Sequence, residues 1–264
     1  MHALLALSSL ETSSSERLLY HWASCISSYN EYLAPKIAAK DASAMLITST
    51  LISGIAFAMV DDTTWPSDTN PGELQWLRLQ QGISLVFMSI DPFDLRGDIQ
   101  VLFTGVEEID EAAATKRDPS LAFPELFAIT SDPKENPYTD ALHSLAAFAY
   151  VPVLPSTIFA HLGFIASLSK PFTSLLEAKD HRALLILAYW YARMCAIDYW
   201  WILRRAKSEC RAICQYLEKY AIFEIQQLLV LPAKVCGYEL KQQAPDDDSA
   251  GRIDASTYIP CRPM

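Results

Sequence analysis

Glycine is scarce in this chain and accounts for only 8 of its 264 residues. Neither G-x-G-x-x-G nor G-x-x-x-x-G-K occurs, so the sequence has no glycine-rich loop of the kind that holds nucleotide phosphates. A low glycine content also suits a helical protein better than one built on tight hairpins. No convincing alternation of apolar and polar residues appears, and residues 98–106 are the only candidate strand.

Positively charged residues are also few relative to negatively charged ones. The chain carries 21 Lys and Arg against 31 Asp and Glu, which gives a net charge of -10. Contacts to phosphates supply most of the affinity of nucleic-acid-binding proteins, so we expect no direct binding to DNA or RNA. The same charge balance disfavours an anionic membrane surface as a partner. The single basic cluster, residues 204–211, is interrupted by Glu209 and is typical of a solvated helix face.

Motifs for metals and for the common catalytic classes are missing. The six cysteines include no C-x-x-C pair, and Cys210 and Cys214 alone do not make a closed zinc site. We therefore expect ordinary thiols in a reducing compartment, which favours an intracellular location, cytoplasmic or nuclear. D-D-x-x-D, H-E-x-x-H and G-x-S-x-G are absent, and we expect neither a metal nor another cofactor.

Two uncharged stretches are long enough to be weighed as membrane spans. Residues 42–60 carry many Ser and Thr, and residues 141–169 are broken by Pro152 and Pro155. The charges of the flanking loops give no clear orientation signal. Buried core helices explain both stretches, so we expect no membrane span.

Helical periodicity dominates the remaining sequence. It predicts an all-α fold of about nine to eleven helices in one compact domain, residues 1–241, followed by a flexible acidic tail, residues 242–264. The predicted helical segments are 2–10, 16–32, 43–60, 73–90, 119–129, 138–150, 156–169, 181–198, 199–220 and 221–231, the last ended by Pro232.

The stretch "AYWYARMCAIDYWWILRRA", residues 188–206, has the highest density of aromatic rings. In a continuous helix Asp198 shares a face with Tyr191 and Trp201, where desolvation would raise its pKa and make it a proton or hydrogen-bond donor. The alternative, which we favour, is that Asp198 caps a helix whose first residue is Tyr199.

The aromatic side chains of this stretch allow two interpretations as well. Rings at this density offer large apolar walls for a hydrophobic ligand, but each ring taken singly is better explained by core packing. The candidate ligand-binding residues are Trp190, Tyr191, Met194, Tyr199, Trp200 and Trp201. The candidate catalytic residues are Asp198, Tyr191, His143 and His161, although His143 and His161 also fit the pattern of core histidines.

Several segments resemble the regulatory region of fungal zinc-cluster transcription factors. These are "MHALLALSSLE", "GELQWLRLQQGISLVF" with Trp76 and Gly82, "YTDALHSLAAF", "HRALLILAYWYARMCAIDYWWILRRAKSECRAICQYL" and "LLVLPAKV". The resemblance covers residues 1–240 and is closest to the sterol-uptake-control type, whose helical C-terminal domain binds a sterol. The chain's cysteines stand 170, 15, 4, 22 and 25 positions apart, so they cannot form the family's two-zinc cluster, and the resemblance does not include a DNA-binding module.

The resemblance implies a regulatory domain that binds a sterol-like or terpenoid-like molecule and forms a homodimer through an apolar helix face. A second hypothesis is a free-standing biosynthetic enzyme, a cofactor-free cyclase or pericyclase acting on a fungal terpenoid or polyketide. Such a reaction needs only a shaped pocket and one or two polar donors. A third is a protein-interaction subunit without a ligand.

Overall fold

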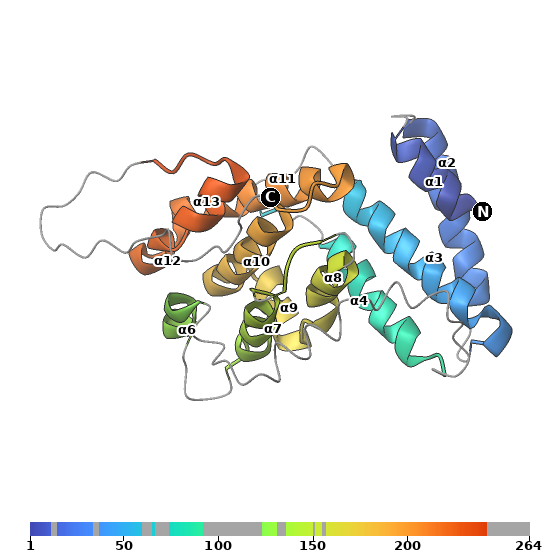
Figure 1. Ribbon diagram of the computed structural model, residues 1–264, viewed down its shortest axis with the longest axis horizontal. Coiled ribbons are helices and arrows are strands. Elements are labelled where there is room, and N and C mark those ends of the chain that lie inside the picture. The colour runs from blue at the N-terminus through green and yellow to red at the C-terminus, as the bar shows by residue number, and fades with distance from the viewer. Residues whose placement is uncertain are drawn as a thin grey trace, which may run out of the picture.

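The structure, a computed structural model, is helical throughout most of the part of the chain that it describes (Figure 1). The described residues are 1–11, 15–33, 37–59, 65–66, 74–91, 123–130, 136–149, 151–154 and 157–241. They contain twelve helices and no strand, which confirms the all-α prediction. The candidate strand at 98–106 and the tail at 242–264 both lie outside these ranges.

The first three helices form what we call the N-terminal layer: α1 (His2–Glu11), α2 (Ser15–Tyr32) and α3 (Ala39–Ala58). They contact one another, and α3 also packs on α4 (Gln75–Met88). The remaining helices are α6 (Pro124–Thr130), α7 (Thr139–Ala149), α8 (Ile158–Ser167), α9 (Lys170–Glu177), α10 (His181–Met194), α11 (Trp200–Tyr220), α12 (Phe223–Gln227) and α13 (Val230–Cys236). Together these eight form what we call the C-terminal body.

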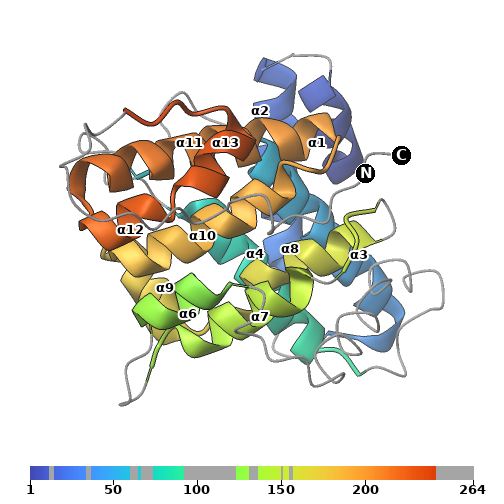
Figure 2. The ribbon, with the colours of Figure 1, turned by 60° about the vertical axis from the view of Figure 1, so that its left-hand side comes forward.

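Helix α10 runs through the middle of the C-terminal body, with α11 and α13 on one side and α6, α7 and α9 on the other (Figure 2). Ten of its fourteen residues are buried. At its start Asp180 accepts hydrogen bonds from the backbone N–H groups of Arg182 and Ala183, 3.1 and 2.9 Å away. This cap satisfies donors that a helix N-terminus would otherwise leave unpaired inside the fold.

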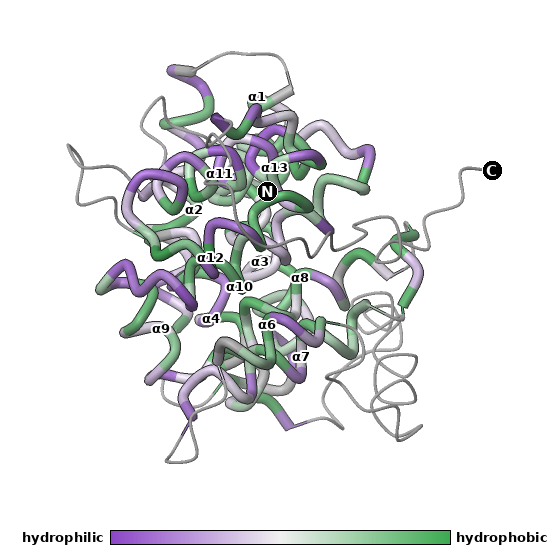
Figure 3. Tube along the Cα trace, turned by 90° about the vertical axis from the view of Figure 1, so that its left-hand side faces the viewer, coloured by the Kyte–Doolittle hydropathy of each residue, from purple (hydrophilic) through white to green (hydrophobic). Residues whose placement is uncertain are grey.

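Along the chain trace, apolar stretches gather toward the middle of the molecule (Figure 3).

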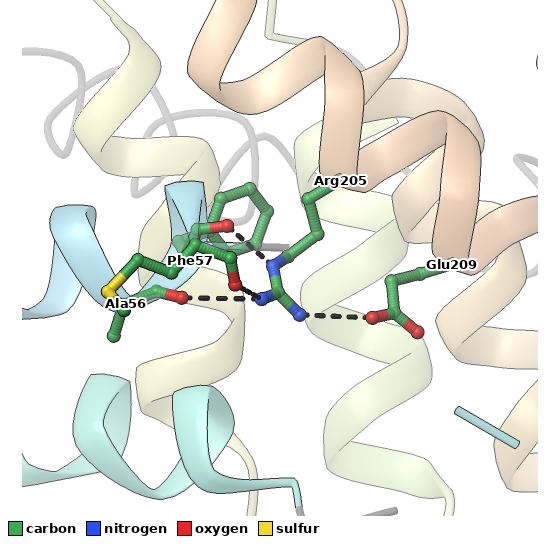
Figure 4. A network of polar contacts seen from close by, with 5 residues as sticks. Ala56, Phe57, Arg205 and Glu209 are labelled. Atoms are coloured by element: carbon green, nitrogen blue, oxygen red, sulfur yellow. Dashed lines mark hydrogen bonds and ion pairs between the residues drawn. The ribbon is translucent and has the colours of Figure 1, made fainter. Parts of the chain in front are cut away.

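A buried arginine joins the two regions. Arg205 on α11 donates hydrogen bonds to the carbonyl oxygens of Ala56, Phe57 and Met59 at the C-terminal end of α3 (Figure 4). It also pairs with Glu209, 3.0 Å away and one helical turn further along. A cation at a helix C-terminus satisfies free carbonyls and complements the helix dipole. Burial raises the pKa of Glu209 to about 7, although the Arg205 charge and a hydrogen bond from the Trp65 backbone oppose the shift.

The number of helices and several helix boundaries differ from the sequence prediction. The sequence predicts that Pro232 ends a helix, but it lies in the first turn of α13, where the missing N–H of proline costs nothing. The predicted helix 221–231 is therefore replaced by two short helices, α12 over Phe223–Gln227 and α13 from Val230. Residues 170–177, which lie outside the predicted helical segments, form α9, with Ser169 at its N-cap.

Helix α3 is the one helix in the described ranges that is long and apolar enough to cross a membrane, over Lys40–Ala58. Its most apolar window is 56% buried against other parts of the protein. Such burial is typical of a core helix. The second uncharged stretch, 141–169, is divided between α7 and α8.

Candidate functional site

A groove of about 570 Å³ lies between α2, α3 and α4. Its lining is mostly apolar and consists of Ile26, Tyr29, Asn30, Leu33, Ile37, Ser49, Ile52, Arg78, Leu79, Gly82, Ile83, Leu85, Val86 and Ser89. This volume lies within the range of about 300–1,000 Å³ that is usual for small-molecule sites. No Asp, Glu, His or Cys is among the described residues that line it.

Helix α4 supplies one wall of the groove because it has two apolar faces. Trp76 and Leu77 are buried in the main hydrophobic core. Leu79, Ile83 and Val86 follow one another at helical spacing on another face and line the groove. Gly82 lies beside them, and a methyl group added there would meet no atom within 4 Å. The space over this turn of α4 is therefore open.

A pair of hydroxyl groups provides the polar feature of the groove. The Tyr29 and Ser49 oxygens lie 2.5 Å apart, and Ser49 donates its own proton to the Met45 carbonyl at 2.7 Å. Because Ser49 has a single proton, Tyr29 is the donor between the two, and the Tyr29 oxygen keeps acceptor capacity. Burial raises the pKa of Tyr29 above its ordinary value. The phenol therefore stays neutral and suits a hydroxyl or other neutral donor on a ligand.

The rim of the groove carries charge, in contrast to its walls. Arg78 forms an exposed ion pair with Glu177 of α9, with N and O atoms 2.9 Å apart. One turn further along α4, Gln81 donates hydrogen bonds to the Leu168 carbonyl and the Thr173 hydroxyl. These contacts fix α4 against the segment that leads into α9. Exposed pairs contribute little to stability, so the Arg78 pair positions the rim more than it stabilises the fold.

The predicted aromatic wall is divided between core and surface. Trp190, Tyr191 and Met194 are almost completely buried in the main core, and the Trp190 ring stacks on Trp76 and Phe164 at centroid distances of 6.2 and 5.7 Å. Tyr199 and Trp200 are exposed, and Trp201 is half-buried against the ring of Phe57. None of these six residues lines the groove. Their role in ligand binding stays a prediction.

The prediction that Asp198 caps the second helix of this stretch is wrong. Helix α10 ends at Met194 and α11 begins at Trp200, with Tyr199 in the N-cap position and no side-chain cap. Asp198 is exposed in the connection between them, so its carboxyl is not pressed into an apolar face either. The five-residue connection breaks the continuous helix that the shared face required, and α11 begins one residue too late for Asp198 to be its N-cap.

The two candidate histidines lie in different environments. His143 is exposed on α7, with its ring 5.8 Å from that of Phe127. His161 is buried on α8, and its Nε2 lies 3.3 Å from the Pro152 carbonyl oxygen. Since that oxygen can only accept, Nε2 carries the proton. Burial and the nearby Arg193 charge lower the pKa of His161 to about 4, so the ring is neutral at pH 7.

The tertiary structure brings three thiols together that are far apart in sequence. The Sγ atoms of Cys210, Cys214 and Cys236, which we call the thiol cluster, lie within 4.8 Å of one another and are buried. Cys210 and Cys214 share a face of α11, as their spacing indicates, and α13 supplies Cys236. Hydrogen bonds from the two α11 thiols lower the pKa of Cys236 below its ordinary value.

The sequence signals for the groove are present but indirect. They are an apolar stripe on α4 that does not coincide with the Trp76 face, and the serine and threonine residues of the largely apolar helix α3. Which residues α2 brings opposite them depends on how three helices cross, and helical periodicity contains no information on that crossing. For the same reason, the sequence does not predict that Cys236 lies beside Cys210 and Cys214.

The chain is similar to a Zn(2)-C6 fungal-type transcription factor of Gibberella zeae. The two are 24% identical over 254 residues, which cover 86% of this chain and 51% of the relative. The chain thus spans about half the length of that curated relative. No protein-family model matches the chain, and no solved structure is significantly similar to it. The similarity supports the fungal regulator-like character that the sequence motifs indicated.

Proposed function

We propose that this chain is a ligand-responsive regulatory domain of the fungal transcription-factor type, and that the groove between α2, α3 and α4 binds a hydrophobic small molecule. The observation that carries the proposal is the groove itself, a mostly apolar cleft of about 570 Å³ with one partly buried hydroxyl pair. Its position at the N-terminal layer differs from the site suggested by the aromatic stretch.

The chemistry of the groove favours a sterol-like or terpenoid-like ligand. Such molecules are large, rigid and apolar with one or two hydroxyl groups, so they bury hydrocarbon against the α4 stripe and need one polar contact. The acceptor capacity of the Tyr29 oxygen provides that contact. The groove has no described acid or histidine, which favours binding over the cyclase or pericyclase hypothesis.

The partners and location of the domain follow from this role. A regulator of this type acts inside the cell, in the cytoplasm or nucleus, and the exposed apolar residues of α1 and α2 suit pairing with a second copy. The net charge of -10 gives the domain no electrostatic attraction to DNA of its own.

The proposal is tested by filling the groove from Gly82. A Gly82→Trp side chain enters the open space over α4 without meeting a neighbouring atom at Cβ, and we expect it to weaken ergosterol binding at least about tenfold. Binding of ergosterol is measured by equilibrium dialysis, and lipids extracted from the purified protein are identified by mass spectrometry.

Two control variants separate filling of the groove from loss of fold. Gly82→Ala keeps the space, and Gly54→Trp places the same bulk on α3 at a glycine that does not line the groove. Both should bind ergosterol as the parent protein does. If Gly82→Trp binds ergosterol normally, or if no lipid is recovered and ergosterol fails to bind the parent protein, the groove is not the sterol site.

A further inference from the structure

We propose that the thiol cluster of Cys210, Cys214 and Cys236 is a binding site for a soft monovalent metal ion, Cu(I), in three-coordinate sulfur geometry. This site is separate from the groove, so it does not depend on the proposed function. Three cysteines on two helices place their sulfur atoms within 4.8 Å of one another in the interior.

The distances fit a bound ion with little rearrangement. Metal–thiolate bonds of about 2.3 Å place three sulfurs in a trigonal plane about 4.0 Å apart. The observed separations, at most 4.8 Å, therefore require each sulfur to move by less than about 1 Å. Cys210 and Cys214, one turn apart on α11, hold two corners of the triangle on a regular helix. Cys236 supplies the third corner from the end of α13.

The donor set selects the ion. No imidazole or carboxylate joins the three sulfurs within the described part of the chain. Glu218 lies on the same helix, but its oxygens accept hydrogen bonds from the Tyr238 hydroxyl and the Lys241 backbone N–H. Structural zinc sites are closed by four ligands, whereas soft thiolates in a site with three donors select Cu(I). Each thiol that coordinates the ion as thiolate releases one proton to solvent.

An exposed residue and a positive charge lie next to the thiol cluster. Gly237 follows Cys236 directly, is exposed and adopts the left-handed conformation that ends α13. The Arg211 guanidinium donates a hydrogen bond to the Gly237 carbonyl at 2.8 Å, so one cation lies close to Cys236. A bound ion would link α11 to α13 and hold the C-terminal end of the described chain in place.

The experiment titrates the reduced 264-residue chain with Cu(I) anaerobically in competition with bicinchoninate. We expect one Cu(I) per chain, and binding about a hundredfold weaker in Cys214→Ser and Cys236→Ser. Cys25→Ser is the matched control, because Cys25 is also buried but lies on α2, away from the cluster. It should bind Cu(I) as the parent protein does.

Two further readouts keep the test independent of variant folding. X-ray absorption of the loaded parent protein should show three sulfur ligands, and Cu(I) should raise the thermal midpoint of the parent and of Cys25→Ser but not of Cys236→Ser. A nitrogen or oxygen ligand, or unchanged Cu(I) affinity in a folded Cys236→Ser variant, overturns the site. Ergosterol binding, measured in parallel, reports on the groove separately.

Discussion

The N-terminal layer and the C-terminal body are both built from helices, but their interiors are packed differently. The body shares one large apolar core to which α6–α13 contribute, with Phe57 of α3 and Trp76 of α4. The N-terminal layer has only two small clusters, one around Ile37, Met45 and Leu46 and one around Cys25 and Ile52. Where a helix has packing neighbours on all sides, side chains fill the interior. Where only α2, α3 and α4 meet, a groove remains between them. Thin packing is thus what leaves the groove open.

The junction between the regions should be the most sensitive point of the molecule. Arg205→Met leaves Glu209 buried without its partner and the α3 carbonyls without donors, and we expect a loss of about 3–5 kcal/mol in the free energy of unfolding. The exposed neighbour Arg204→Met should change the free energy of unfolding by less than about 0.5 kcal/mol. Urea denaturation measures both. Equal effects of the two variants would show that the junction does not hold α3 in place.

The contrast in packing is tested by one substitution in each region. Leu187→Ala removes a fully buried side chain from the main core and should cost about 2–5 kcal/mol. Leu85→Ala removes a groove-lining side chain that is 68% exposed and should cost less than about 1 kcal/mol. The two free energies of unfolding, measured in urea, should differ clearly. Similar costs would mean that the groove wall is as tightly packed as the core.

The free energy of unfolding should also depend on pH through His161. Its pKa is about 4 in the folded protein, against 6.5 for a histidine in an unstructured peptide, so the unfolded chain takes up a proton first as the pH falls. Stability is then full above pH 6.5 and falls between pH 6.5 and 4, by up to about 3 kcal/mol. His161→Gln should lose this part of the pH dependence, whereas His143→Gln, at the exposed histidine, should keep it. A pH series of urea unfolding curves decides between these outcomes.

Much of the fold was predictable because helix formation is local. Capping residues, the spacing of apolar residues and proline positions placed α1, α2, α4 and α7 within a few residues of their observed bounds. Two predictions were wrong, that Asp198 caps a helix and that Pro232 ends one. Both failed because a short connection and a helix start have similar sequence signals. His161 is a neutral core histidine, which was one of the two interpretations its uncharged surroundings allowed.

By itself the sequence determined the helical class, which its low glycine content supports, together with the acidic net charge and the fungal regulator-like motifs. These follow from composition and from patterns within ten to twenty residues. Only the tertiary structure decided that the aromatic stretch is divided between core and surface, that a groove opens between α2, α3 and α4, and that Cys236 joins Cys210 and Cys214. The physical reason is that sites are made by the crossing of helices distant in sequence, and crossing angles depend on side-chain packing across the whole fold.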